Sequence, residues 1–93
     1  MNYKFIGWCR EGKHDKVWGV IELHSNAYVI FWGRRGAKLQ TKIYEDKIWG
    51  AQVLINLKRG KGYHEVKRHE LDTVYPEFQA DLEKTAFWAM FKV

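Results

Sequence analysis

The segment from residue 31 to residue 36 carries side chains whose types and spacing suit ligand binding. It reads Phe-Trp-Gly-Arg-Arg-Gly, so Trp32 stands immediately before a glycine-flanked pair of arginines. A flat indole ring can stack on an exposed base or sugar, while guanidinium groups bind phosphate with paired N–H donors. Gly33 and Gly36 allow a tight turn and a close approach of the backbone to a ligand. The pattern favours a nucleic-acid ligand, and its alternative is a core tryptophan followed by a solvated turn.

The positive charge of the chain is concentrated in and after this segment. The 93 residues include 16 Lys and Arg against 11 Asp and Glu, a net charge of +5. Residues 34–68 hold ten of the basic and three of the acidic side chains, so they carry the whole excess. Such a region is typical of a phosphate-binding surface, and equally of a solvated face. The candidate binding residues are Trp32, Gly33, Arg34, Arg35, Lys38, Gln40, Lys42, Lys58, Arg59 and Lys61.

Residue sets that support catalysis or metal binding are sparse. Ser25 is the only serine and lies in an expected turn, which gives a serine nucleophile no support. One cysteine, Cys9, cannot build a zinc-finger ligand set with the four histidines. His64 and His69, each beside a glutamate, are more typical of a solvated connection than of a metal site. We therefore expect no enzymatic activity, no cofactor and no metal.

The size and composition indicate a small protein of a reducing compartment. Ninety-three residues fit one compact domain. A single cysteine excludes an intrachain disulfide, so Cys9 is expected as a buried small hydrophobe. There is no signal-peptide pattern at the N-terminus and no apolar stretch as long as a membrane span. We expect a cytoplasmic or nucleoid-associated protein without membrane contact.

Hydrophobic patterning predicts four strands in the first half of the chain. They cover residues 3–10, 16–24, 27–32 and 37–43. The third is almost wholly apolar, as in a strand covered on both faces. Ser25 and Asn26 form a hairpin-type break, and the other connections are also short, so an antiparallel meander is expected. In the fourth strand the polar face presents Lys38, Gln40 and Lys42.

Residues 45–59 switch to a helical period with two apolar stripes. One stripe consists of Ile48, Ala51, Leu54 and Ile55, and the other of Trp49, Val53 and Leu57. Acidic residues 45–46 begin the expected helix, basic residues 58–59 end it, and Gly60 is the C-cap candidate. Two stripes imply a helix covered on two sides. We expect the sheet to cover one and the C-terminal segment to cover the other.

The last third of the chain is expected to add one short strand and one helix. Residues 64–67 are the strand candidate, and Pro76 is a candidate first residue of the helix. In line along that helix are Phe78, Leu82, Ala86 and Ala89. The apolar run at residues 87–91 is expected to dock as its end; an added strand and a partner-binding patch are the alternatives. The fold class is therefore α+β, a four- to five-stranded antiparallel sheet with one helix packed across it and a C-terminal helix.

Several of these features together resemble the WGR domain, a family named for its Trp-Gly-Arg motif. They are the motif at residues 31–36, the basic strand and helix after it, and Lys-Arg-Gly-Lys-Gly-Tyr at residues 58–63. The family is best known from DNA-damage-dependent poly(ADP-ribose) polymerases. The resemblance implies a WGR-like domain over residues 1–66 and a C-terminal extension over residues 67–93. It also implies a sheet crossed by one helix and binding to DNA strand breaks.

The same resemblance assigns roles to two residues. Trp32 would pack against the end of a broken strand, and Arg34 would contribute to DNA and inter-domain contacts. No transferase domain accompanies the motif, so catalysis activated by strand breaks is not implied. A domain of this kind standing alone is expected as an accessory protein of a bacterium or phage.

Two functions follow from the sequence. The first is a non-enzymatic nucleic-acid-binding module that takes DNA at ends, nicks or single-stranded features. RNA is an open alternative, because it offers the same stacking and charge. The second is a protein-interaction regulator that docks on a polymerase, a nuclease or another host protein through the aromatic C-terminal segment at residues 86–93.

Overall fold

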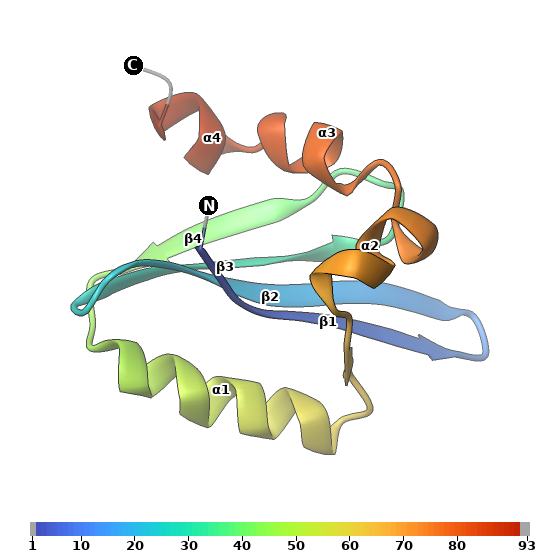
Figure 1. Ribbon diagram of the computed structural model, residues 1–93, viewed down its shortest axis with the longest axis horizontal. Coiled ribbons are helices and arrows are strands. Elements are labelled where there is room, and N and C mark those ends of the chain that lie inside the picture. Colours follow the sequence, from blue (N-terminus) through green and yellow to red (C-terminus); the bar gives the residue numbers. More distant parts are fainter. Residues whose placement is uncertain (1, 92–93) are drawn as a thin grey trace.

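The computed structural model describes residues 2–91, in which a five-stranded antiparallel sheet is the middle of three layers. The strands are β1 (Asn2–Glu11), β2 (His14–His24), β3 (Ala27–Arg34), β4 (Gln40–Tyr44) and β5 (His64–Glu65), in the spatial order β4-β3-β2-β1-β5. Helix α1 (Ile48–Gly60) lies on one face. The short helices α2 (Arg68–Val74), α3 (Phe78–Glu83) and α4 (Ala86–Phe91) lie on the other (Figure 1). The predicted fold class is confirmed.

Each face of the sheet has its own hydrophobic core, because successive strand side chains point to opposite faces. Val29 and Phe31 of β3 belong to the core under the C-terminal helices. Tyr28 and Ile30 of the same strand belong to the core under α1. This arrangement explains why β3 is apolar on both faces and confirms that it is a doubly covered strand. Cys9 is buried and free, also as expected.

The C-terminal segment forms an integral layer of the protein. Its buried side chains Tyr75, Phe78, Leu82 and Phe87 share one core with the sheet. In place of one helix there are two short ones, α3 and α4, separated at Thr85, whose hydroxyl donates to the Leu82 carbonyl at 2.7 Å. This break turns Phe87 inward and leaves Ala86 and Ala89 exposed, so the predicted in-line stripe ends at Leu82. Residues 92–93 lie outside the described residues.

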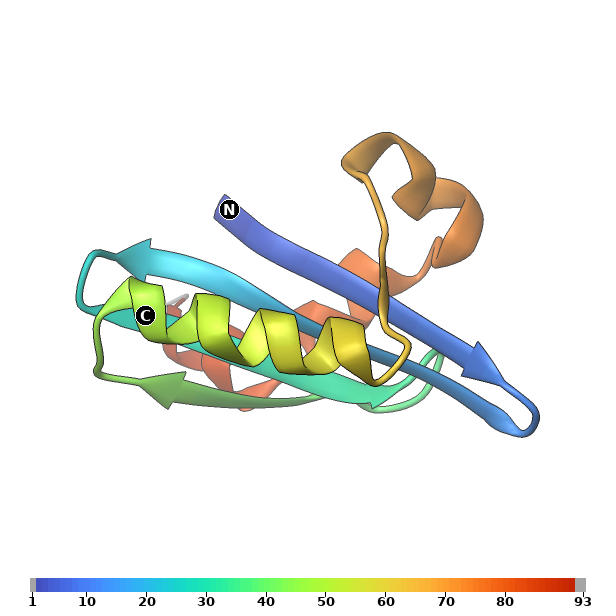
Figure 2. The ribbon, with the colours of Figure 1, turned by 90° about the horizontal axis from the view of Figure 1, so that it is seen from below.

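Helix α1 is covered on one side only. Ala51 and Ile55 face the sheet and are buried. The second stripe is exposed, with Trp49 at 66%, Val53 at 52% and Leu57 at 58%. The expectation that the C-terminal segment covers this stripe is wrong, because that segment crosses to the opposite face of the sheet (Figure 2). There it buries apolar strand side chains that would otherwise face water.

The start of α1 is fixed by the hairpin between β2 and β3. The helix begins at Ile48, three residues later than the periodicity predicts, and the Ile48 N–H donates to the Ser25 carbonyl at 2.9 Å. At its other end, Gly62 has a φ of 96°, so it takes the left-handed position expected of Gly60. These two ends place Lys58 and Tyr63 beside the ends of β2 and β3.

Candidate nucleic-acid interface

A pocket of about 520 Å³ lies between the C-terminal end of α1 and the adjoining parts of β2 and β3. We call it the Trp32 pocket. It is lined by Lys16, Val17, Trp18, Ile30, Trp32, Gly33, Arg34, Tyr44, Lys58 and Tyr63. Four of these side chains are aromatic and three are cationic, and no described Asp or Glu lines the pocket. Its volume falls in the range of small-ligand sites and is large enough for one nucleotide.

Two cross-strand pairs form the sheet side of this pocket. Trp18 lies opposite Trp32, and Lys16 lies opposite Arg34. Side chains of directly opposed residues project from the same face with their Cβ atoms about 5 Å apart. Two aromatic rings therefore stand beside two cations. Trp18 is 5% exposed and forms the floor, whereas Trp32 is partly exposed and presents its ring to a ligand.

The pairing of two cations costs stability unless an anion joins them. Like charges directly opposite one another on a sheet are destabilising. Within residues 2–91, neither Lys16 nor Arg34 forms an ion pair with an acidic side chain. Both are exposed at the mouth of the pocket. The arrangement is suited to a phosphate group, which would bridge the two side chains.

A β-bulge creates these pairs. Next to the turn, His24 pairs with Ala27, and an unbroken register from there would place Trp18 opposite Gly33. The bulge immediately before His24 adds one residue to β2 and shifts the register. Trp18 consequently faces Trp32, and the two aromatic side chains share the α1 face of the sheet.

Lys58 reaches the pocket from the last turns of α1. Its Nζ lies 5.6 Å from the ring centroid of Trp18 and 5.6 Å from that of Tyr63. Burial lowers the pKa of the Lys58 ammonium, and the positive charges of Lys61 and Lys16 lower it further. An anion in the pocket would offset both effects, because an opposite charge favours the protonated form.

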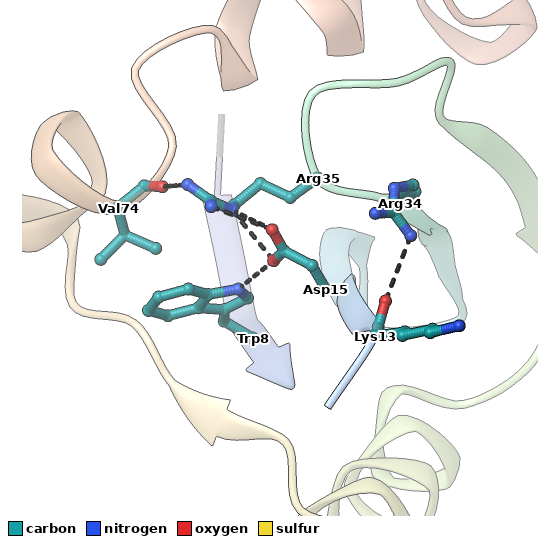
Figure 3. Close-up of polar contacts among 6 residues, drawn as sticks. All are labelled: Trp8, Lys13, Asp15, Arg34, Arg35 and Val74. Carbon is teal, nitrogen blue, oxygen red and sulfur yellow. Dashed lines mark hydrogen bonds and ion pairs between the residues drawn. The ribbon is translucent and has the colours of Figure 1, made fainter. Parts of the chain in front are cut away.

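The adjacent arginines have different partners (Figure 3). The Arg35 guanidinium donates to both carboxylate oxygens of Asp15 at 2.9 to 3.1 Å and to the Val74 carbonyl at 2.6 Å. Arg34 points away from this group and makes one 3.4 Å hydrogen bond, to the Lys13 carbonyl. Arg34 therefore keeps N–H donors for a ligand, while all three nitrogens of Arg35 are engaged within the protein.

Arg35 belongs to a network that joins several elements. Trp8 of β1 donates its indole N–H to Asp15 at 2.6 Å, and the Arg35 guanidinium lies 5.1 Å from the Trp8 ring centroid. The bond to Val74 adds the end of α2. Hydrogen bonds from Arg35 are the main cause that holds the pKa of Asp15 below its ordinary value. Arg35 therefore holds β1, β2 and the end of α2 together, and it lies outside the Trp32 pocket.

The motif glycines are required by the backbone. Gly33 has a φ of 154°, and a Cβ there would lie 3.1 Å from both the Leu39 side chain and the Lys38 carbonyl. Gly36 has a φ of 83° in a turn closed by the Ala37 N–H and the Arg34 carbonyl at 3.0 Å. Glycine at the third position of such a turn is typical of type II geometry. A side chain at either glycine would therefore strain the backbone on each side of Arg34 and Arg35.

The three polar residues predicted on the fourth strand lie in different places. Lys38 precedes β4 and lines a separate hollow beside Lys84, on the side of the C-terminal helices. Gln40 lies opposite Trp32. Lys42 is exposed, with its Nζ 5.2 Å from the ring centroid of the pocket residue Tyr44. Gln40 and Lys42 therefore lie beside residues of the pocket, but Gln40 also lines the hollow that contains Lys38.

The predicted basic residues after Lys58 lie outside the pocket. Arg59 forms a 2.9 Å ion pair with Glu65, and its guanidinium lies 5.1 Å from the Phe5 ring centroid. Lys61 is exposed just after α1. Of the ten predicted residues, the structure gathers in the pocket Trp32, Gly33, Arg34 and Lys58.

Sequence reasoning missed six residues that line the pocket, namely Lys16, Val17, Trp18, Ile30, Tyr44 and Tyr63. Tyr63 stood at the end of the segment that carried the family resemblance. Lys16 and Trp18 share one face of the second strand by simple alternation, which was a usable signal. Their position beside the motif, however, depends on the bulge.

Comparison of the chain with protein-family models, curated proteins and solved structures finds no match. The WGR resemblance therefore rests on the sequence features given above. Within residues 2–91, no three His, Cys, Asp or Glu side chains are grouped to hold a metal ion. No helix in that part of the chain has the length and hydrophobicity of a membrane span.

Proposed function

We propose that the protein binds nucleic acid, specifically DNA at ends, nicks or single-stranded features, through the Trp32 pocket. The observation that carries this proposal is the pair Lys16–Arg34 beside the pair Trp18–Trp32, in a pocket without a described carboxylate. Rings and cations in one concave site match the two parts of a nucleotide. A ring of the pocket stacks on a base, and the cations bind the attached phosphate.

The shape of the site favours a base that has left the double helix. A base inside a duplex has neighbours on both faces, so it cannot stack on a side chain within a pocket. A terminal, unpaired or single-stranded base has a free face for Trp32. Such stacking contributes about 1 to 3 kcal/mol per base. Exposed ends are therefore preferred over continuous duplex.

Phosphate binding falls to the cations around Trp32. Arg34 offers guanidinium N–H donors, and Lys16 faces it across the strands. Lys58 supplies a third charge from α1. Lys42, near Tyr44, extends the positive surface along the sheet edge and would follow the backbone of the nucleic acid. Each phosphate neutralised releases counterions, so affinity falls steeply with salt.

The alternative of protein docking through residues 86–93 has less support. Phe87 is 4% exposed, and Trp88 packs against the same core. A partner would have to displace these side chains from the sheet. Phe87 and Trp88 are used for the fold, and among the described side chains of this segment the exposed large apolar one is Met90.

A binding titration with matched variants tests the proposal. A labelled single-stranded DNA oligonucleotide is titrated at low salt with wild type, Trp32→Ala and Arg34→Ala, using fluorescence anisotropy. The control is Lys84→Ala, which removes one exposed cation at the end of α3, outside the Trp32 pocket. Each pocket variant should bind at least about fivefold more weakly than wild type, since about 1 kcal/mol is lost, and the control should match wild type.

If wild type does not bind, or the control loses as much affinity as the pocket variants, the proposal fails. Parallel titrations with duplex RNA and single-stranded RNA show whether the protein binds DNA or RNA more tightly.

A further inference from the structure

An apolar stripe lies on the outer side of α1, away from the Trp32 pocket. Trp49, Val53 and Leu57 are each more than half exposed. Their i, i+4, i+8 spacing puts them in one row, opposite the buried Ala51 and Ile55. Figure 2 looks directly onto α1 and shows no other element in front of it. A row of large apolar side chains in water marks an interaction surface.

The two ends of α1 carry opposite charges, which restricts the orientation of a partner helix on the stripe. Glu45, Asp46 and the N-cap residue Lys47 give the start of the helix a net charge of −1, and basic Arg59, which is paired with Glu65, and Lys61 stand at its end. Glu45 and Lys61 are exposed, and neither forms an ion pair within residues 2–91. A partner helix with the same pattern would match these charges only if it ran antiparallel.

The spacing of the three stripe residues suits a twofold pairing of two α1 helices. Val53 is its centre, and Trp49 and Leu57 stand four residues away on either side. When two copies of α1 cross antiparallel at Val53, Trp49 of each copy meets Leu57 of the other. The same arrangement brings the acidic start of each helix to the basic end of its partner, and it opposes the two helix dipoles favourably.

We propose that a second copy of this chain covers the stripe, in a twofold dimer with the two α1 helices antiparallel. Lys58 lies on the sheet side of α1, so the Trp32 pocket stays open in this dimer. The two pockets come to opposite ends of the helix pair. The dimer is independent of the proposed nucleic-acid binding, because its contacts use other side chains.

Sedimentation velocity of the protein alone tests the dimer. Three side chains make a contact well below the roughly 800 Å² per partner of a standard interface, so dissociation at about micromolar or higher concentrations is expected. Wild type should shift from the 11.1 kDa monomer towards twice that mass as its concentration rises from about 1 µM to several hundred µM. Val53→Asp should stay monomeric, because it sets two carboxylates together at the twofold axis.

Matched variants separate this dimer from other association. Ala80→Asp adds the same charge to an exposed site of α3 on the opposite face and should dimerise as wild type does. Glu45→Lys and Lys61→Glu should each weaken the dimer several-fold, and the double variant should restore it. Circular dichroism confirms that each variant is folded.

Three outcomes would overturn the proposal. They are a wild type that stays monomeric to several hundred µM, a dimer that survives Val53→Asp, and a double charge reversal that gives no recovery.

Discussion

Trp18 and Trp32 lie directly opposite one another on β2 and β3, yet they differ in exposure. Trp18 is 5% exposed and packs with Phe5, their ring centroids 6.1 Å apart. Trp32 is partly exposed at the pocket. The first ring therefore stabilises the fold and the second is available to a ligand. Substituting each one separates stability from binding.

Trp18→Ala should destabilise the protein by about 3 to 5 kcal/mol, because it removes a large buried ring and leaves a cavity. Trp32→Ala should cost about 1 kcal/mol of folding free energy, since its ring is already partly hydrated. The Trp32 variant should nevertheless lose about 1 to 3 kcal/mol of single-strand binding. Urea unfolding and anisotropy measure the two effects. Equal loss of stability in both variants would contradict the assignment of floor and binding surface.

Substitution of the two motif arginines should also have different effects: Arg34 matters for DNA binding and Arg35 for stability. Arg34→Ala should weaken DNA binding and change stability by no more than about 0.5 kcal/mol, as for an exposed side chain. Arg35→Ala should reduce stability by about 2 kcal/mol, because Asp15 and the Val74 carbonyl lose their donor. Arg35→Lys keeps the charge and should recover only part of this loss, since an ammonium lacks the planar fork. The prediction is wrong if Arg35→Ala unfolds at the wild-type urea concentration.

The Asp15–Arg35 pair should make stability depend on acid pH. The pKa of Asp15 lies below its ordinary value of 3.8 in the folded protein, chiefly because Arg35 donates hydrogen bonds to the carboxylate. A carboxyl whose pKa is depressed by folding contributes stability above its unfolded pKa and loses it as the pH falls through the folded pKa. Wild type should therefore exceed Asp15→Asn in unfolding free energy at pH 7. This difference should be constant down to about pH 5 and shrink below pH 4. A difference that persists to pH 2 would show that the charge of Asp15 is irrelevant.

The affinity for nucleic acid should fall at alkaline pH as the Lys58 ammonium loses its proton. Its pKa in the free protein lies below the ordinary 10.5 because the ammonium is buried near other cations. A bound phosphate favours the ammonium form, so binding takes up protons and affinity falls as the pH rises through the free-protein pKa. Wild type should lose more affinity for a single strand between pH 7 and pH 9.5 than Lys58→Arg, which stays charged. Parallel pH profiles for the two proteins would place Lys58 outside the binding surface.

The fold could largely be predicted from the sequence because its signals are local. Alternation along residues 16–24, the apolar run of β3 and the helical period before Lys58 each specify one element. Local sequence patterns could not show which segment, if any, covers the outer side of α1. The apolar residues of the C-terminal segment fit either an exposed stripe on α1 or the open face of the sheet. The break at Thr85 and the burial of Phe87 on the sheet decide between them.

The site could be predicted only in part. Trp32 and Arg34 are identified by their side-chain chemistry, which is visible in the motif. The partners Trp18 and Lys16 depend on a bulge of one residue in β2, and no residue type marks that bulge. Arg34 and Arg35 look equivalent in the sequence. Only the distant partners Asp15 and Val74 distinguish them.

The preference for exposed ends is tested most directly with one DNA sequence in two forms. A closed circular duplex and the same molecule cut once are compared as competitors for the labelled complex, at two salt concentrations, with wild type and Trp32→Ala. Wild type should be displaced more efficiently by the cut molecule, and Trp32→Ala should not distinguish the two forms. Both should bind more weakly at higher salt. Equal competition by the closed circle and the cut duplex against wild type would contradict a pocket that takes exposed ends.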